Sequence, residues 1–159
     1  MLIYAGIDEA GYGPMFGPLC VASCAFIMHD YDPTHGEPDM WSLLSKVICR
    51  TRKEAVPKIA VNDSKKLKSN AKHKALTHLE RGVLAFLASE TNFIPDNDTE
   101  FFDATDSASH DQDWYEGQTT LPISNDLNVL KIDNAMLRKH LKENNISCPW
   151  MKCTSIDVG

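Results

Sequence analysis

The sequence predicts one domain of the mixed α/β class. Its 159 residues are enough for one domain of ordinary size. With 43% hydrophobic and 24% charged residues, the chain has the composition of a globular protein that buries a sizeable core. Short apolar runs typical of strands alternate with segments in which apolar residues recur at the helical period. This order predicts an α/β or α+β architecture.

The first two expected elements are strands. Residues Leu2–Ile7 are apolar and rich in strand formers, and we expect a buried strand that ends at the charged pair Asp8–Glu9. A second run of this kind, Leu19–Ile27, follows Gly17-Pro18. The tight connection between the two runs predicts that they pair antiparallel.

Helices follow these strands. Asp39 can cap a helix whose apolar positions continue to Ile48 at the helical period. A short strand is expected at Lys58–Val61. Ser69 or Asn70 then caps a helix ending near Ser89, with a buried stripe of Leu76, Leu79, Val83 and Leu87.

The last expected elements are a helix and a strand. Asp126 caps the helix, with Leu127, Leu130, Leu137 and Leu141 inward and Lys131, Arg138, Lys139 and Lys142 outward. We expect the outward side to be an ordinary solvated face. Residues Trp150–Val158 predict the last strand.

The acidic residues are concentrated in one stretch. The chain has a net charge of −6, and eight acidic residues but no Lys or Arg lie between Asp96 and Glu116. The rest of the chain is close to neutral, so one basic face remains possible. We expect a solvated acidic insertion at about 92–120.

The sequence also limits where the protein works. No apolar run reaches the roughly 18 residues that cross a bilayer. The N-terminus lacks the basic residues of a signal peptide. The five cysteines contain no Cys-x-x-Cys pair, so we expect free thiols. We therefore expect a cytoplasmic protein with no membrane contact and no obligate protein partner.

The candidate catalytic residues lie in the segment Gly6–Pro14, which contains two adjacent carboxylates followed by glycines. Two adjacent carboxylates point to opposite faces within a regular strand, so both can serve one metal only if the chain leaves strand geometry at Glu9. Gly11 and Gly13 make such a departure inexpensive. The glycine spacing and the following prolines exclude the common phosphate-binding loops.

Two motifs resemble one known family. Gly6–Pro14, followed by Phe16-Gly17-Pro18, resembles the opening signature of the type 2 ribonucleases H, the ribonuclease HII-like family. The segment Asn62–Leu67 resembles the second signature of that family. The resemblance covers roughly residues 2–88, and the Gly-Tyr-Gly form is similar to a divergent branch of the family.

The resemblance implies a fold and an activity. It implies a ribonuclease H-like fold, with a mixed sheet flanked by helices, of which residues 1–159 would be an N-terminal portion, incomplete at the C-terminus. The implied activity is endonucleolytic cleavage of RNA in RNA–DNA hybrid duplexes, including duplexes with embedded ribonucleotides. Two divalent cations, Mg²⁺ or Mn²⁺, would assist phosphodiester hydrolysis.

The resemblance also assigns roles to residues. Asp8 and Glu9 would be catalytic metal ligands, because hard cations prefer carboxylate oxygens. The loop that reads the ribonucleotide 2′-hydroxyl would be Gly11, Tyr12 and Gly13. Ser64 and Lys65 would lie near a phosphate of the substrate.

The chain departs from the family pattern in two places. Tyr12 stands where typical members have arginine, which weakens the attraction for phosphate. The third carboxylate of the family would be Asp157 or would lie beyond Gly159, and the fourth has no candidate. The alternative function is therefore a catalytically inactive, nuclease-derived module that binds nucleic acid or a protein.

Overall fold

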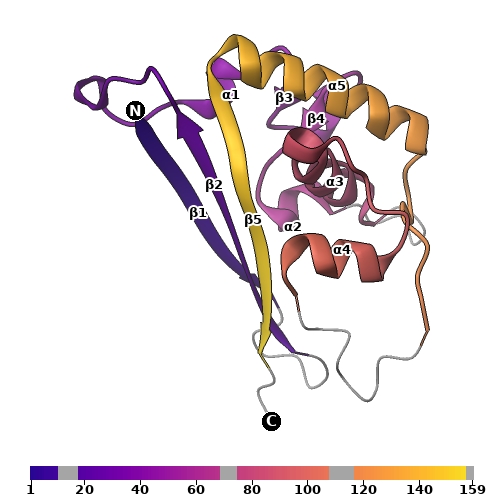
Figure 1. Ribbon diagram of the computed structural model, residues 1–159. Coiled ribbons are helices and arrows are strands. Elements are labelled where there is room, and N and C mark those ends of the chain that lie inside the picture. Colours follow the sequence, from indigo (N-terminus) through magenta and orange to yellow (C-terminus); the bar gives the residue numbers. More distant parts are fainter. Residues whose placement is uncertain (11–17, 69–74, 108–116, 157–159) are drawn as a thin grey trace.

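The computed structural model describes residues 1–10, 18–68, 75–107 and 117–156 (Figure 1). Within these ranges a three-stranded antiparallel sheet, a two-stranded parallel sheet and several helices form a mixed α/β fold. The α/β class expected from the sequence is therefore confirmed. The helices gather beside the last strand of the larger sheet, and its first strand lies apart from them (Figure 1).

The larger sheet has the strand order β1-β2-β5. β1 spans Leu2–Ala10, β2 spans Leu19–Met28 and β5 spans Ile146–Ile156. The central strand β2 pairs antiparallel with both neighbours, which confirms the predicted pairing of the first two strands. The last strand begins earlier than the predicted Trp150, because Ile146 is paired with Met28 in the core.

β1 is exposed, and the prediction of a buried strand is wrong. Ile3 and Ile7 expose 62% and 78% of their surface, and only Leu2 packs against the core. The cause is the placement of the helices, since α3, α4 and α5 contact β5 and leave β1 uncovered. Among the described residues, no further strand pairs with the outer edge of β1.

The helix predicted after Asp39 is short. α1 spans Met40–Leu43 and starts where predicted, with the carboxylate of Asp39 accepting hydrogen bonds from two N–H groups of the first turn. Its predicted continuation is wrong, because Ile48–Cys49 forms β3, which pairs in parallel with β4, Ile59–Ala60. The predicted strand at Lys58–Val61 is thereby confirmed. Two 3-10 helices complete this region: η1, Pro33–His35, precedes α1, and η2, Arg52–Glu54, lies between β3 and β4.

Two long helices pack against each other and against the sheet. α3 spans Thr77–Thr91 and α5 spans Leu127–Glu143. α5 begins at the predicted cap, where the carboxylate of Asp126 accepts a hydrogen bond from the N–H of Asn128 at 2.8 Å. None of the helices in the described ranges has both the length and the apolar character needed to cross a lipid bilayer. The core of buried residues joins both helices to strands and loops: Met28, Met40, Leu44, Val47, Ile48, Ile59, Ala85, Leu137, Leu141 and Ile146.

The buried face of α3 differs from the predicted stripe. Leu76, just before the helix, and Val83 expose 46% and 39% of their surface, whereas Leu84 is buried. The helix is rotated so that Arg81 faces α5, where it pairs with the buried Asp133. A buried ion pair therefore sets the orientation that apolar periodicity alone did not predict.

Part of the predicted acidic insertion is a packed helix. α4 spans Asp98–Thr105 and starts at Asn97, whose side chain accepts a hydrogen bond from the N–H of Glu100 at 3.0 Å. It contacts β5, and Asp98 and Thr105 are buried. The expectation of a solvated loop is wrong for this part, because Asn97 also bridges to Thr120 and closes the segment onto itself.

Candidate active site

Asp8 and Glu9 lie inside β1. The strand continues through both residues to Ala10, with Asp8 opposite Ala22 and Glu9 opposite Val21. The pair therefore lies near the C-terminal end of the strand, as predicted, but the backbone does not leave strand geometry at Glu9, the departure that a shared metal site requires. Both carboxylates are exposed to solvent.

Strand alternation sends the two side chains to opposite faces. Phe26 and Met28 of β2 face the helices and the core, and the residues opposite them are Tyr4 and Leu2. Because side chains alternate, Asp8 points to this same face and Glu9 points to the open face of the sheet. The Oδ1 atom of Asp8 also accepts a hydrogen bond from the N–H of Glu9 at 3.0 Å.

The second motif surrounds a short helix. α2 spans Ser64–Leu67, and the carboxylate of Asp63 caps it by accepting the N–H of Lys65 at 2.8 Å. Asn62 donates a hydrogen bond from Nδ2 to the carbonyl oxygen of Arg50 at 2.8 Å. Asn62 and Asp63 therefore shape the backbone, while the side chains of Ser64 and Lys65 are exposed.

A small apolar cavity relates the two motifs in space. It has a volume of about 260 Å³ and is lined by β2, β5, α3 and two residues of the second motif, Asn62 and Leu67. Cys24 of β2 also lines it and pairs with Gly6 of β1. Asp8 is the next residue of β1 on that face, so the second motif and Asp8 share one side of the sheet.

His78 was not singled out by the sequence analysis, yet it lines this cavity. Its Nδ1 atom is buried and has no hydrogen-bond partner among the described residues. Burial, together with the charges of Arg52 and Arg81, lowers the pKa of His78. The imidazole is therefore held neutral in an apolar environment.

Burial makes Cys24, Cys148 and Cys153 poor nucleophiles. All five cysteines are free, as expected. Burial, with smaller contributions from Cys24 and Glu90, raises the pKa of Cys148 to about 12. Burial also raises the pKa of Cys24 and Cys153. Since the thiolate is the reactive form, these cysteines are packing residues.

Several predicted site residues cannot be placed. Gly11, Tyr12 and Gly13 lie outside the described residues, as do Asp157 and the two expected caps Ser69 and Asn70. The described residues contain no cluster of three or more His, Cys, Asp or Glu side chains arranged to hold a metal ion. No hydrogen bond or ion pair between described residues joins the two motifs directly.

The donor chemistry at the end of β1 fits a hard divalent cation. Asp8 and Glu9 both offer carboxylate oxygens, the ligands that Mg²⁺ and Mn²⁺ prefer. Both are exposed, on a strand whose outer edge is unpaired among the described residues. Because the two side chains point to opposite faces of the sheet, the carboxylates do not converge on one point in this backbone conformation.

No family model, no curated protein and no solved structure matches this chain.

Proposed function

We propose that this chain belongs to a metal-dependent endonuclease that cleaves RNA in RNA–DNA hybrid duplexes, built on a ribonuclease H-like fold. The observation that carries the proposal is the pair of motifs around Asp8 and Ser64. The first motif begins within β1 and the second follows β4. Both resemble signatures of the type 2 ribonucleases H, and the second lies on the sheet face to which Asp8 points.

Each residue then has a role in the proposed reaction. Asp8 and Glu9 hold Mg²⁺ or Mn²⁺, which when bound supplies an activated water and stabilises the departing 3′ oxygen. Lys65 attracts a substrate phosphate with its exposed ammonium group, and Ser64 donates a hydrogen bond to it. The family resemblance assigns recognition of the ribonucleotide 2′-hydroxyl to Gly11, Tyr12 and Gly13.

The proposed location is the cytoplasm, where the five free thiols persist and hybrid duplexes are accessible.

The test is cleavage of a duplex carrying one embedded ribonucleotide, with Mg²⁺ or Mn²⁺. Asp8→Asn is expected to abolish cleavage, because it removes an anionic ligand, and to leave the unfolding transition nearly unchanged, because the side chain is exposed. Glu37→Gln, an exposed carboxylate far from the motifs in sequence, is the matched control and retains activity. An active Asp8→Asn protein would contradict the assignment of the site.

A second candidate is an inactive, nuclease-derived module that binds nucleic acid or a protein partner. The opposite directions of Asp8 and Glu9 favour it, because carboxylates on opposite faces of a strand reach one metal ion only if the backbone rearranges. This candidate predicts duplex binding without added metal that Asp8→Asn leaves unchanged. The nuclease predicts metal binding that Asp8→Asn removes.

A further inference from the structure

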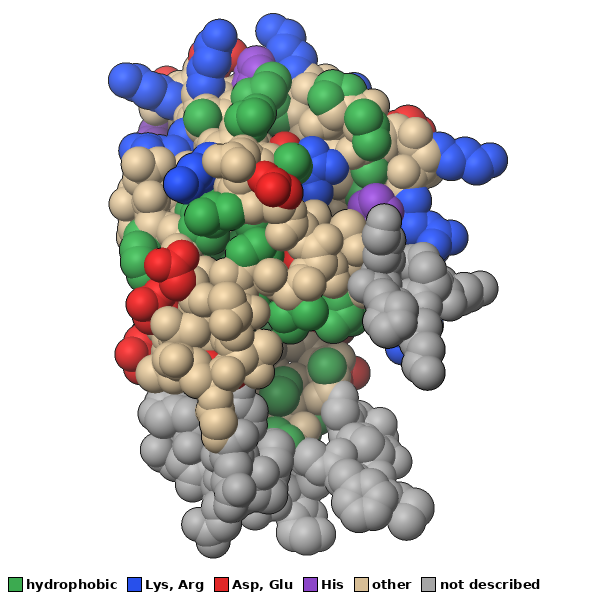
Figure 2. All heavy atoms as spheres, turned by 90° about the vertical axis from the view of Figure 1, so that its right-hand side faces the viewer, with side chains coloured by type: hydrophobic (Ala, Val, Ile, Leu, Met, Phe, Trp, Pro, Cys, Tyr) green, Lys and Arg blue, Asp and Glu red, His purple; other side chains and the backbone are tan. Residues whose placement is uncertain are grey.

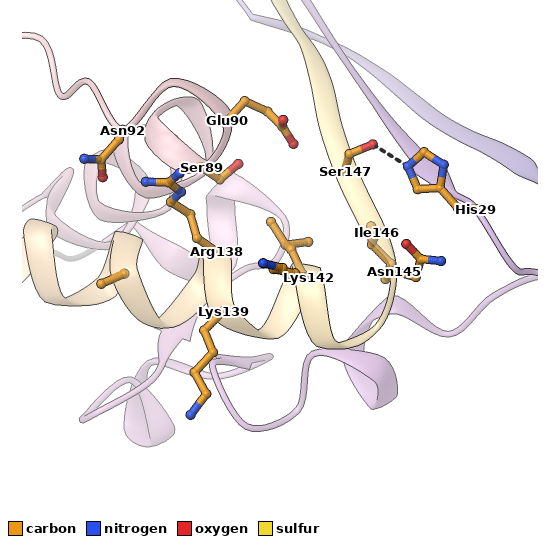
Figure 3. Close-up of a pocket in the computed structure, with 12 residues that line it drawn as sticks. His29, Ser89, Glu90, Asn92, Arg138, Lys139, Lys142, Asn145, Ile146 and Ser147 are labelled. Carbon is orange, nitrogen blue, oxygen red and sulfur yellow. Dashed lines mark hydrogen bonds between the residues drawn. The ribbon is translucent and has the colours of Figure 1, made fainter.

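The strongest unassigned feature is an open cavity of about 560 Å³ at the far end of the sheet from Asp8 and Glu9 (Figure 3). Three parts of the fold build it: the C-terminal end of α3, one face of α5, and the start of β5 beside the end of β2. His29 and Ser147 close one side, with a hydrogen bond of 3.2 Å between Nε2 and Oγ.

Cations outnumber acids in this cavity. Arg138, Lys139 and Lys142 line it, and Glu90 is its one acidic residue. An oxygen of Glu90 is already engaged, accepting the N–H of Cys148 at 2.7 Å. The cavity therefore has a net positive charge that suits an anionic ligand.

Two of the cations have no ionic partner. Arg138 and Lys142 are exposed and form no ion pair with a described residue, and in Figure 3 Arg138 lies beside Ser89. Lys139 differs, because its ammonium group lies 3.8 Å from the carboxylate of Glu143 and points away from the other labelled side chains (Figure 3). Arg138 and Lys142 are thus the groups available to a ligand.

The basic surface is elongated. A second cavity of about 500 Å³ shares Asn92 with the first and is lined by Lys131, one further cation of α5. Lys131, Arg138 and Lys142 fall on one face of the helix at its natural period and span about 16 Å of the helix axis. Asp96 lines the second cavity, so the positive charge is concentrated in the first.

Charges are also segregated on the face that Figure 2 shows. In Figure 2, Lys and Arg side chains gather at the top, the end of the molecule where α5 lies, while acidic side chains gather lower down. A row of cations along a groove matches the repeated phosphates of a nucleic acid strand better than a single small anion. About five nucleotides of one strand cover the length of the row.

We infer that this groove, formed by α5 and the C-terminal end of α3, binds the phosphate backbone of a nucleic acid duplex through Arg138 and Lys142. The inference deepens the proposed function and rests on it for the choice of duplex. It assigns to the molecule a backbone contact separate from the carboxylates of β1, which would position the substrate without reading its sequence.

The test measures binding rather than cleavage. A fluorescently labelled RNA–DNA duplex of roughly 20 base pairs is titrated with the full chain in EDTA, at several salt concentrations, by fluorescence anisotropy. The double variant Arg138→Ala/Lys142→Ala is expected to raise Kd about tenfold and to make the slope of log K against log salt shallower by about 2. Lys46→Ala/Lys53→Ala, which removes two exposed lysines that do not line the cavity, is the matched control and is expected to leave Kd nearly unchanged.

The outcomes separate this inference from its alternatives. An unchanged Kd and salt slope in the double variant overturns the inference. If the double variant lowers the melting temperature but leaves Kd unchanged, the cations only stabilise the C-terminal end of α5, and the inference is again overturned. Inorganic phosphate and unlabelled duplex are also compared as competitors at equal total phosphate concentration. If inorganic phosphate displaces the labelled duplex as well as the unlabelled duplex does, the groove is a site for a small anion and the inference is overturned. Since EDTA removes the metal, a failed cleavage assay leaves this result standing.

Discussion

Arg81 of α3 and Asp133 of α5 form a buried, bidentate ion pair, with Nε–Oδ2 and Nη2–Oδ1 distances of 2.5 and 2.7 Å. The same guanidinium donates hydrogen bonds to the carbonyl oxygens of Ala55 and Pro57, at 2.6 and 3.2 Å. The hydrogen bonds to Asp133 raise the pKa of Arg81, so it stays charged. One side chain thus connects two helices and the loop after η2.

Arg81→Met is expected to destabilise the protein by about 3–5 kcal/mol, because it leaves the Asp133 carboxylate buried without a partner. Urea unfolding followed by circular dichroism measures the change. Arg81→Met/Asp133→Leu removes both charges and is expected to recover part of the loss. A double variant less stable than Arg81→Met would contradict this account.

His78 gives the protein a pH-dependent stability. Its pKa is lowered in the folded state, so below its ordinary pKa of about 6.5 the unfolded chain binds more protons than the folded one. Above about pH 6.5 His78 is neutral in both states and does not lower the stability. As the pH falls below that value toward the folded-state pKa, the unfolded chain takes up the proton and the free energy of unfolding decreases.

His78→Leu is therefore expected to reduce the difference in unfolding free energy between about pH 7.5 and about pH 5.5. The measurement is urea unfolding at both pH values. His35→Gln, at an exposed histidine, is the control that keeps the wild-type dependence. An undiminished dependence in His78→Leu would place its origin elsewhere.

The cap of α4 is testable because the sequence predicted no helix there. Asn97→Ala removes the acceptor for the N–H of Glu100 and is expected to cost about 1 kcal/mol. The denaturation midpoint reports it, with Asp103→Asn on the exposed side of α4 as control. Equal midpoints for the two variants would show that α4 adds little to the stability of the fold.

Lys65 and Lys66 offer a matched pair for the proposed nuclease. Both are exposed lysines of α2, but only Lys65 matches the position that the family resemblance places near a phosphate. Lys65→Ala is expected to lower kcat/KM for hybrid cleavage about tenfold, the loss of one charge-assisted contact. Lys66→Ala is expected to change it little, and equal losses would assign both lysines to general attraction.

The sequence predicted the structural features that depend only on neighbouring residues. Asp39 and Asp126 cap helices as expected, because an N-cap depends on neighbouring residues alone. Contacts distant in sequence decided the rest. Val47 and Ile48 follow a helical period, yet their backbone continues into the parallel pair with β4, and Arg81 turns α3 toward α5.

The same distinction between local and distant contacts applies to the candidate site. The sequence predicted that Asp8 and Glu9 would follow strand formers, but it did not predict that β1 would continue through them, since pairing with Val21 and Ala22 determines this. For the cationic groove, the sequence predicted the basic residues on the outward side of α5 but not the residues that complete the groove. Its partner residues, such as His29 and Ser89, come from elements distant in the sequence.

β1 also has a consequence for the exchange of its amide hydrogens with solvent. In an antiparallel edge strand, alternate N–H groups turn toward the neighbouring strand, and the others turn outward. Along Leu2–Ala10 the inward amides are shielded by β2, whereas the outward ones meet water. In deuterium oxide the strand would label with a period of two residues, and the hydrogen bond to the carboxylate of Asp8 would slow the exchange of the Glu9 amide.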